Sequence, residues 1–366
     1  MTRTLITILV ASLLLGSALL SAVGQATSRA RRTENEQQQQ PKQQPTPKPQ
    51  GTPREDEVDL KDDEVVRVET DLTNILFTAA DKQRHFITTL KQEDIRIIED
   101  GQPQEIFTFA RQVDLPLSLA ILIDTSGSEE RTLPSEKAAA KAFTDSVVRP
   151  DKDEVAIISF TGEVTLEQGL TSSLSRIRQA LDRVEYIPPA GSVGPIPGTP
   201  PINGNTLAGW TAIWDAIWVT SDEVLSKTSD KTRRAIILLT DGQDTKSMKK
   251  MSDAIDHAVK ADAVIYCIGI GDEYMSGINE GALNKLAEKT GGRAFFPHDD
   301  ESKLRAAFAQ IQQELRSQYL IAYSPTNKSR DGSFRKVQIE LLNPELRKNL
   351  KLTYRQGYFA KTTASQ

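Results

Sequence analysis

The sequence has very little cysteine and histidine, and this excludes several classes of site. Cys267 is the only cysteine among 366 residues, so neither an intrachain disulfide nor a cysteine cluster for zinc can form. It lies in the apolar run 263–268, where we expect a buried and unreactive thiol. The three histidines are His85, His257 and His298, and no motif pairs any of them with a serine or cysteine nucleophile. The sequence therefore gives no support to a serine or cysteine hydrolase.

The sequence also lacks a strong excess of charge of either sign. It has 45 Lys and Arg against 50 Asp and Glu, a formal net charge of −5, and no basic stripe. Because nucleic-acid binding depends on clustered positive charge, we expect no nucleic-acid partner. Gly269-Ile270-Gly271 is a lone fragment of a dinucleotide fingerprint, with no further glycine at the required spacing. Nucleotide binding is therefore not expected either.

The N-terminus has the layout of an export signal. Arg3 precedes an apolar stretch from Leu5 to about Val23, and small residues follow at Gly24 and Ala26. This predicts a signal peptide over 1–26 and a secreted or periplasmic protein, with association to the envelope as a variant. The alternative is an uncleaved signal that tethers the protein to a membrane, since the stretch nearly reaches spanning length. In both cases the rest of the chain lies outside the cytoplasm.

A Gln- and Pro-rich segment over 27–63 has almost no apolar residue to bury, and we expect a disordered linker there. Short strand-like pieces follow over 64–112 and return over 318–360, before a tail over 361–366. Neither set of strands can bury its apolar face alone. We therefore predict that the two sets pair into one small β-sandwich and that the intervening residues 113–317 form an inserted domain.

The inserted region alternates between strand-like and helix-like segments. The predicted strands are 117–123, 154–160, 234–240, 263–268 and 293–296, and the predicted helices are 134–148, 174–184, 211–225, 251–260, 279–289 and 302–316. Such alternation is typical of an α/β fold in which a doubly wound, mostly parallel sheet is covered by helices on both faces.

The strongest candidate site follows the first strand of this region. The apolar run from Leu119 to Ile123 ends abruptly in Asp124, Ser126 and Ser128, with Gly127 between the serines. Open α/β sheets place their ligand sites at the carboxyl ends of strands. Three hard oxygen groups within five residues suit one hard divalent cation. Taken alone, the same residues also suit a turn followed by a helix cap.

Two further segments bring polar residues to the same end of the sheet. The apolar strand 236–239 ends in Thr240 and Asp241, and Thr211 stands at the start of a predicted helix. Each could be a simple turn or cap residue. Their joint occurrence after or before correctly placed elements instead favours one shared site.

Together these residues resemble the von Willebrand factor type A domain and its metal-ion-dependent adhesion site. The resemblance covers about Leu117 to Arg316, and the flanking strands resemble those of bacterial secreted proteins related to this family. It implies that Ser126, Ser128 and Thr211 give hydroxyl oxygens to the metal, and that Asp124 and Asp241 act mainly through water. It also implies a bound Mg²⁺, with Mn²⁺ or Ca²⁺ as alternatives, and one open position for a partner's carboxylate.

Some features depart from the family pattern. Trp210 precedes Thr211, where the family often has Gly-Gly-Thr, and Thr206 is an alternative ligand. The Pro- and Gly-rich loop 187–207 is expected to border the site, or else to be a tolerated insertion. Glu129 and Glu130 follow the serines directly; we expect solvated first-turn charges, with an adjacent ion site as the alternative.

From these features we expect a binding module rather than an enzyme. The metal would capture a Glu or Asp side chain of a protein partner. A metal-dependent hydrolase that uses the same Asp, Ser and Thr residues is the first alternative, and a metal-free structural scaffold is the second.

Overall fold

The computed structural model describes residues 72–111, 114–187, 210–271, 277–298 and 300–362. The predicted signal peptide, the linker, the first part of the 64–112 region, nearly all of the 187–207 loop with Thr206, and most of the C-terminal tail lie outside these ranges. The chain divides into two compact units, Met1–Val66 and Arg67–Gln366, and all described residues belong to the second. Among the helices that the structure describes, none is long and apolar enough to cross a membrane.

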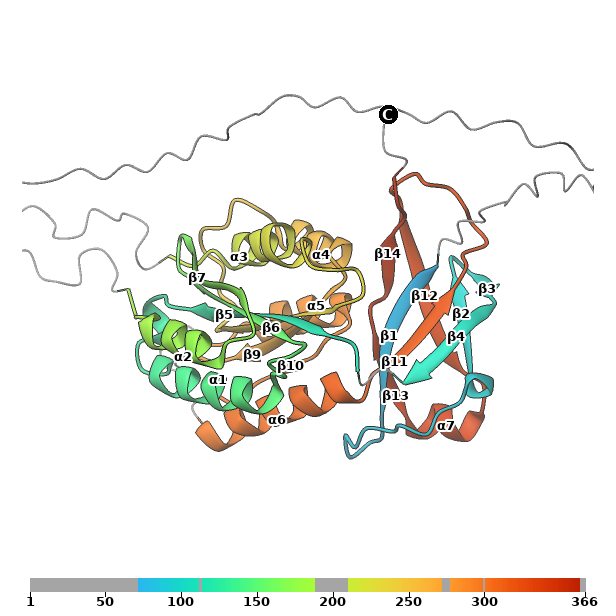
Figure 1. The fold of residues 1–366 in the computed structure, drawn as a ribbon, viewed down its shortest axis with the longest axis horizontal. Helices are drawn as coiled ribbons and strands as arrows, with labels where there is room; N and C mark the ends of the chain where they lie inside the picture. The colour runs from blue at the N-terminus through green and yellow to red at the C-terminus, as the bar shows by residue number, and fades with distance from the viewer. Residues whose placement is uncertain (1–71, 112–113, 188–209, 272–276, 299, 363–366) are drawn as a thin grey trace, which may run out of the picture. The chain divides into compact units, whose positions relative to one another are not determined.

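A mostly parallel sheet forms the centre of the α/β region (Figure 1). Its strand order is β10-β9-β8-β5-β6-β7, and only β7 runs antiparallel to its neighbour among these six strands. The strands are β5 (Leu117–Asp124), β6 (Glu154–Phe160), β7 (Val164–Thr171), β8 (Arg233–Thr240), β9 (Ala263–Gly269) and β10 (Ala294–Phe295). The predicted fold class is confirmed.

Helices cover both faces of this sheet, which explains the unbroken apolar run of β5. Leu119 and Ile121 face one core, and Ala120 and Leu122 face the other, because successive side chains of a strand point to opposite faces. The first core includes α1 (Leu133–Val147), α2 (Leu174–Arg183) and α6 (Glu301–Arg316); the second includes α3 (Ile213–Val219), α4 (Met251–Lys260) and α5 (Glu280–Thr290).

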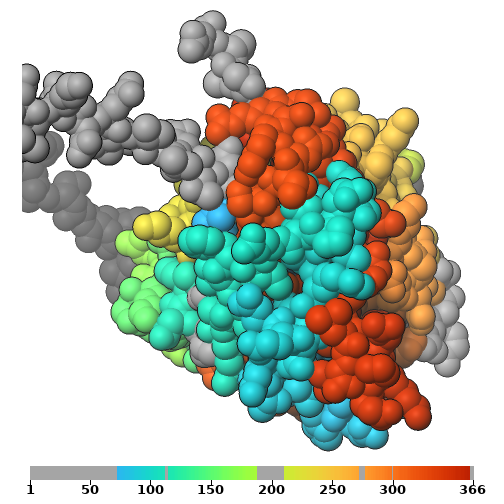
Figure 2. Space-filling model, turned by 90° about the vertical axis from the view of Figure 1, so that its right-hand side faces the viewer, coloured from blue at the N-terminus to red at the C-terminus, as the bar shows by residue number. Residues whose placement is uncertain are grey.

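Strands from both ends of the chain form two further sheets, as predicted. One has the order β13-β1-β11-β4 and the other β14-β12-β2-β3. Their side chains share one core, and in Figure 2 the cyan and orange-red segments lie side by side. The strands are β1 (Thr73–Ala80), β2 (Ile95–Glu99), β3 (Gln102–Gln104), β4 (Ile106–Arg111), β11 (Tyr319–Tyr323), β12 (Phe334–Leu341), β13 (Lys351–Tyr354) and β14 (Gly357–Phe359).

The turn between β2 and β3 is a two-residue hairpin turn. Glu99 pairs directly with Gln102, so Asp100 and Gly101 alone make the turn, with φ of 47° and 84°. Two successive positive φ angles match the right-handed twist of a hairpin, and Asp-Gly is a favoured pair for them.

Other departures occur where the apolar pattern is weak. Strand β7, strand β14 and the short helix α7 (Pro344–Asn349) were not predicted. The helix predicted from Thr211 begins at Ile213, and its second half, Thr220–Leu225 (η3), is a π-helix. Two short 3₁₀ turns, η1 (Gln92–Asp94) and η2 (Gly127–Glu129), complete the described elements.

Candidate metal site

Two neighbouring parallel strands deliver the acidic residues of the site to one edge of the sheet. Strand β5 ends at Asp124 and strand β8 ends at Thr240, and Ile123 pairs with Leu239 in the register of the two strands. The Thr240 hydroxyl donates a hydrogen bond of 2.6 Å to Oδ2 of Asp124 and accepts one of 3.2 Å from the amide of Gly242. Thr240 therefore orients Asp124 and fixes the turn that carries Asp241.

The two predicted serines lie beside Asp124. The Ser126 amide donates to Oδ1 of Asp124 at 2.9 Å, so the carboxylate is held from both of its oxygens. The 3₁₀ turn η2 then brings the next hydroxyl back, and Ser126 Oγ and Ser128 Oγ are 3.3 Å apart. The Asp-x-Ser-x-Ser spacing thus places three oxygen-bearing side chains together.

Thr211 lies at the same edge of the sheet. The amide of Ala212, the next residue, donates to the carbonyl of Thr161 at 2.7 Å, and the Thr125 amide donates to the carbonyl of Phe160 at 2.9 Å. The loop that carries Thr211 and the loop that follows Asp124 are therefore both hydrogen-bonded to the end of β6. Thr211 is buried, but within the described part of the chain no hydrogen bond joins its side chain to Asp124, Ser126 or Ser128.

Glu129, for which a solvated charge was expected and an adjacent ion site was the alternative, joins Asp124 and Asp241 in one acidic cluster. One carboxylate oxygen from each residue lies within 4.8 Å of the other two. Glu129 is 0% exposed, so the expected solvated charge was wrong for this residue, whereas Glu130 is exposed. The strand end, η2 and the β8 turn therefore converge on a shared carboxylate site.

Glu136 of helix α1 is a second buried carboxylate that the sequence analysis missed. It is 0% exposed, and neither of its carboxylate oxygens has a hydrogen-bond partner among the described residues. A signal for it does exist in the sequence: Glu136 falls on the same helical stripe as the buried Leu133, Ala140 and Phe143. A charged residue on an apolar stripe is more informative than one on a solvated face.

Burial dominates the electrostatics of these groups. It raises the pKa of Asp124 to about 7 and, together with the charges of Glu136 and Asp124, raises the pKa of Glu129 to about 11. Burial likewise raises the pKa of Glu136 to about 8. Each shift means that burial and the neighbouring carboxylates disfavour the ionised form. A cation between these carboxylates would supply that compensation.

The donor set fits a hard divalent cation. Oxygen ligands stand about 2.0 to 2.6 Å from Mg²⁺ or Ca²⁺, so ligands on opposite sides of one ion are about 4 to 5 Å apart. The 4.8 Å limit of the acidic cluster agrees with this span. Carboxylates and hydroxyls are also the ligand types that such ions prefer over soft metals. Asp124, Asp241, Ser126 and Ser128, with Glu129, are the residues that would hold the metal.

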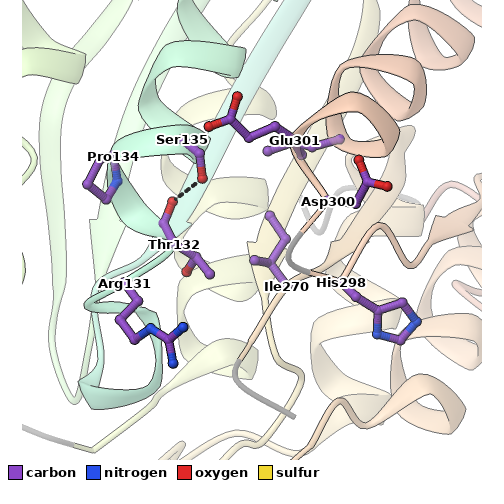
Figure 3. A pocket seen from close by; sticks show the side chains of 9 residues that line it. Arg131, Thr132, Pro134, Ser135, Ile270, His298, Asp300 and Glu301 are labelled. Atoms are coloured by element: carbon purple, nitrogen blue, oxygen red, sulfur yellow. Dashed lines mark hydrogen bonds between the residues drawn. The ribbon is translucent and has the colours of Figure 1, made fainter.

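A cavity of about 310 Å³ adjoins the cluster through Thr132. Figure 3 shows residues of three segments around it: Thr132 and Ser135 near the start of α1, Ile270 after β9, and His298 with Glu301 before and in α6. The Thr132 hydroxyl donates to Oε2 of Glu129 at 2.8 Å. His298 lines this cavity. His257 instead pairs with Asp222 on the opposite face of the sheet.

Replacing Thr240 with Val is expected to weaken divalent metal binding about 10- to 100-fold. Valine keeps the volume of threonine but removes the donor to Asp124 and the acceptor for the Gly242 amide. Calorimetric titration with Mn²⁺ measures the change. Thr165→Val on β7, an exposed position, is the control and should bind as the wild type does; equal affinities for both variants would contradict an orienting role for Thr240.

Comparison with known proteins agrees with this architecture. Two family models for the von Willebrand factor type A domain match the chain, over residues 119–243 and 202–312. Similar solved structures include proximal thread matrix protein 1 of the mussel byssus with a zinc-occupied MIDAS motif, at 22% identity and a TM-score of 0.46. The match covers 59% of this chain and 50% of the mussel chain, so this chain spans about half the length of that protein.

Two bacterial structures are also similar. BatB of Bacteroides thetaiotaomicron has 17% identity and a TM-score of 0.40, over 55% of this chain and 98% of BatB. A von Willebrand factor type A protein of Catenulispora acidiphila has 14% identity and a TM-score of 0.44, over 74% of each chain. No curated protein matches the sequence. The two family matches run through the strands that carry the acidic cluster, and the chain is a von Willebrand factor type A domain protein.

Proposed function

We propose that this protein is a binding module that captures an acidic side chain of a protein partner through a divalent cation. The observation that carries the proposal is the buried cluster of Asp124, Glu129 and Asp241 at the carboxyl ends of two parallel strands. Ser126 and Ser128 supply neutral oxygens beside it, and Thr211 supplies a third from the same edge. Mg²⁺ is the proposed ion, with Mn²⁺ or Ca²⁺ as alternatives.

The surface beside Thr211 supports an acidic partner. The backbone carbonyl of Thr211 accepts hydrogen bonds from the amides of Thr245 and Lys246. The Lys246 ammonium lies 5.5 Å from the ring centre of the exposed Trp210, and Met248 nearby is 92% exposed. An exposed aromatic, an exposed methionine and a lysine suit a segment that combines a carboxylate with an apolar side chain.

We propose binding rather than catalysis at the cluster. A hydrolase would need a base or acid positioned toward a substrate at the metal. His85 belongs to the β-sandwich, where it pairs with Asp81, and His257 pairs with Asp222 at the α3–α4 face. His298 lines the cavity that adjoins the cluster and is the histidine that the hydrolase alternative would use. With a divalent cation bound, the cluster instead offers an ion to which a partner's carboxylate can bind. The proposed setting is the periplasm or the cell exterior, on the strength of the export signal over 1–26.

A pull-down from the native envelope fraction tests the proposal. The full exported chain should retain a partner in the presence of Mg²⁺, lose it on addition of a chelator, and lose it in Asp124→Ala. Glu130→Ala, at the exposed neighbour of the cluster, should retain it. A partner that is retained equally in all four conditions would refute a metal-mediated contact. Sustained phosphoester turnover by the purified protein, abolished in Asp124→Ala, would favour the hydrolase alternative.

A further inference from the structure

We propose that Glu129 is an internal ligand of the metal. Its carboxylate occupies the position that a partner's carboxylate would take and thereby holds the site closed. This inference rests on the proposed function, because it assigns a role within the same site. It predicts that capture of an external carboxylate requires Glu129 to leave the ion. The family resemblance assigns this position no part in binding the metal.

The first argument is the place of the Glu129 carboxylate among the predicted ligands. Its Oε1 is 3.3 Å from Ser128 Oγ, which is in turn 3.3 Å from Ser126 Oγ. One carboxylate oxygen of Glu129 also lies within 4.8 Å of carboxylate oxygens of both Asp124 and Asp241. The Glu129 carboxylate is therefore surrounded by the same serines and aspartates that would bind the ion. A cation bound by those residues would also contact Glu129.

The second argument is that Glu129 is fixed there from its other side. Oε2 accepts the Thr132 hydroxyl at 2.8 Å, and the Glu129 amide donates to the carbonyl of Ser126 at 3.0 Å. One oxygen is thus anchored to the protein while the other faces the serines. A flexible surface glutamate has no such pair of contacts, and Glu129 is fully buried.

Glu136 supplies an independent sign that a cation belongs here. Its carboxylate is fully buried close to Glu129, and neither of its oxygens has a hydrogen-bond partner among the described residues. The charges of Glu129 and Glu136 are close enough for Glu136 to raise the pKa of Glu129. A buried carboxylate without a partner is costly unless a positive charge is near.

The third argument is the burial of the residues that form the cluster. Asp124, Ser126, Glu129, Thr211 and Asp241 are all buried, and Ser128 is only partly exposed. Gly271 closes the side next to Asp241, since a Cβ there would lie 2.8 Å from the Asp241 Cβ and 3.8 Å from Oε1 of Glu129. Because the described residues of the cluster are buried in this way, we expect an external carboxylate to reach the ion only after a side chain of the site moves.

Charge gives the chemical consequence. Three carboxylates around one divalent ion leave a net negative charge, and this weakens the attraction for a fourth. Loss of Glu129 from the ion restores a neutral site with a free position. The geometry therefore assigns Glu129 the role of a competitor that sets how strongly the site captures a partner.

The test counts the water ligands of bound Mn²⁺ by water-proton relaxation, on the full exported chain. Glu129→Ala is expected to weaken Mn²⁺ binding about tenfold or more and to give the bound ion one additional water. Sodium acetate, as a carboxylate probe, should then displace that water in Glu129→Ala at a concentration at least tenfold lower than in the wild type. Glu129→Asp, which keeps the charge but shortens the side chain, should also gain the water.

Controls separate this inference from the proposed function. Glu130→Ala, an exposed carboxylate next in sequence, should change neither the Mn²⁺ affinity by more than twofold nor the number of waters. If Glu129→Ala and the wild type have the same affinity, water count and acetate response while Asp124→Ala loses the metal, the internal ligand is refuted and the metal site stands. If the wild type binds no Mn²⁺, the proposed function fails as well.

Discussion

Saturating Mg²⁺ or Mn²⁺ is expected to raise the melting temperature of the chelator-treated protein by about 5 to 10 °C. A ligand at about 100 times its dissociation constant stabilises the folded state by about 2.7 kcal/mol, and each kcal/mol shifts the melting temperature of a domain of 150 to 250 residues by about 2 to 4 °C. The gain arises because the cation compensates carboxylates that are buried without water. Differential scanning calorimetry with a series of metal concentrations measures it.

Asp124→Asn should abolish most of the rise in melting temperature that metal causes. Without metal, the amide removes a buried charge but keeps an acceptor for the Ser126 amide, so the variant should melt at a higher temperature than the wild type. With metal, the variant should gain little, and the order of the two proteins should invert. Glu130→Gln is the matched control and should respond as the wild type does. A full metal response in Asp124→Asn would place the ion somewhere other than this cluster.

Replacing Glu99 with Ala is expected to lower the free energy of unfolding by about 3 to 5 kcal/mol. Glu99 is buried in β2, and its Oε2 accepts the hydroxyls of Tyr323 at 2.7 Å and Tyr358 at 2.9 Å. Hydrogen bonds to a charged group contribute about 1.5 to 3 kcal/mol each, and the substitution leaves two hydroxyls without their acceptor. Because Tyr323 belongs to the other sheet of the sandwich, the loss weakens the contact between the sheets. Urea unfolding measures it.

Glu340→Ala provides the comparison on a neighbouring strand. Glu340 of β12 pairs with Arg96 of β2 at 2.7 Å, with side chains that are 27% and 49% exposed. Exposed ion pairs contribute about 0 to 1 kcal/mol, so this variant should unfold close to the wild type. Equal losses for Glu99→Ala and Glu340→Ala would contradict a structural role for the buried carboxylate.

The parts of the fold that the sequence predicted well are those with an unbroken apolar pattern. Strand β6 and helix α4 have the predicted bounds, because the spacing of apolar residues in each segment fits only one kind of element. The pairing of strands from both ends of the chain was also predictable, since neither set could bury its apolar face alone. Strand β7 was missed because it lies at the sheet edge, where Glu167 and Gln168 interrupt the apolar alternation.

The site was predictable in part, for a similar reason. Asp124, Ser126 and Ser128 follow a strand directly, so their position depends only on where β5 ends. Glu129 depends instead on the direction of the chain after the serines. The turn η2 is separated from α1 by Glu130 to Thr132, and this break turns Glu129 inward rather than onto a solvated first turn. Spacing along the sequence does not encode such a change of direction.

The insertion of the α/β region between β4 and β11 has a consequence for the order of folding. These two strands pair antiparallel, with Leu320 opposite Ala110 and Tyr319 opposite Arg111, so the two ends of the insert are fixed one strand spacing apart. Closing that pair over an unfolded insert would carry the full entropy cost of a long loop. An insert that has already folded, with its first strand and last helix adjacent to the junction, removes most of that cost. We therefore expect the insert to fold early and strands β4 and β11 of the sandwich to pair afterwards.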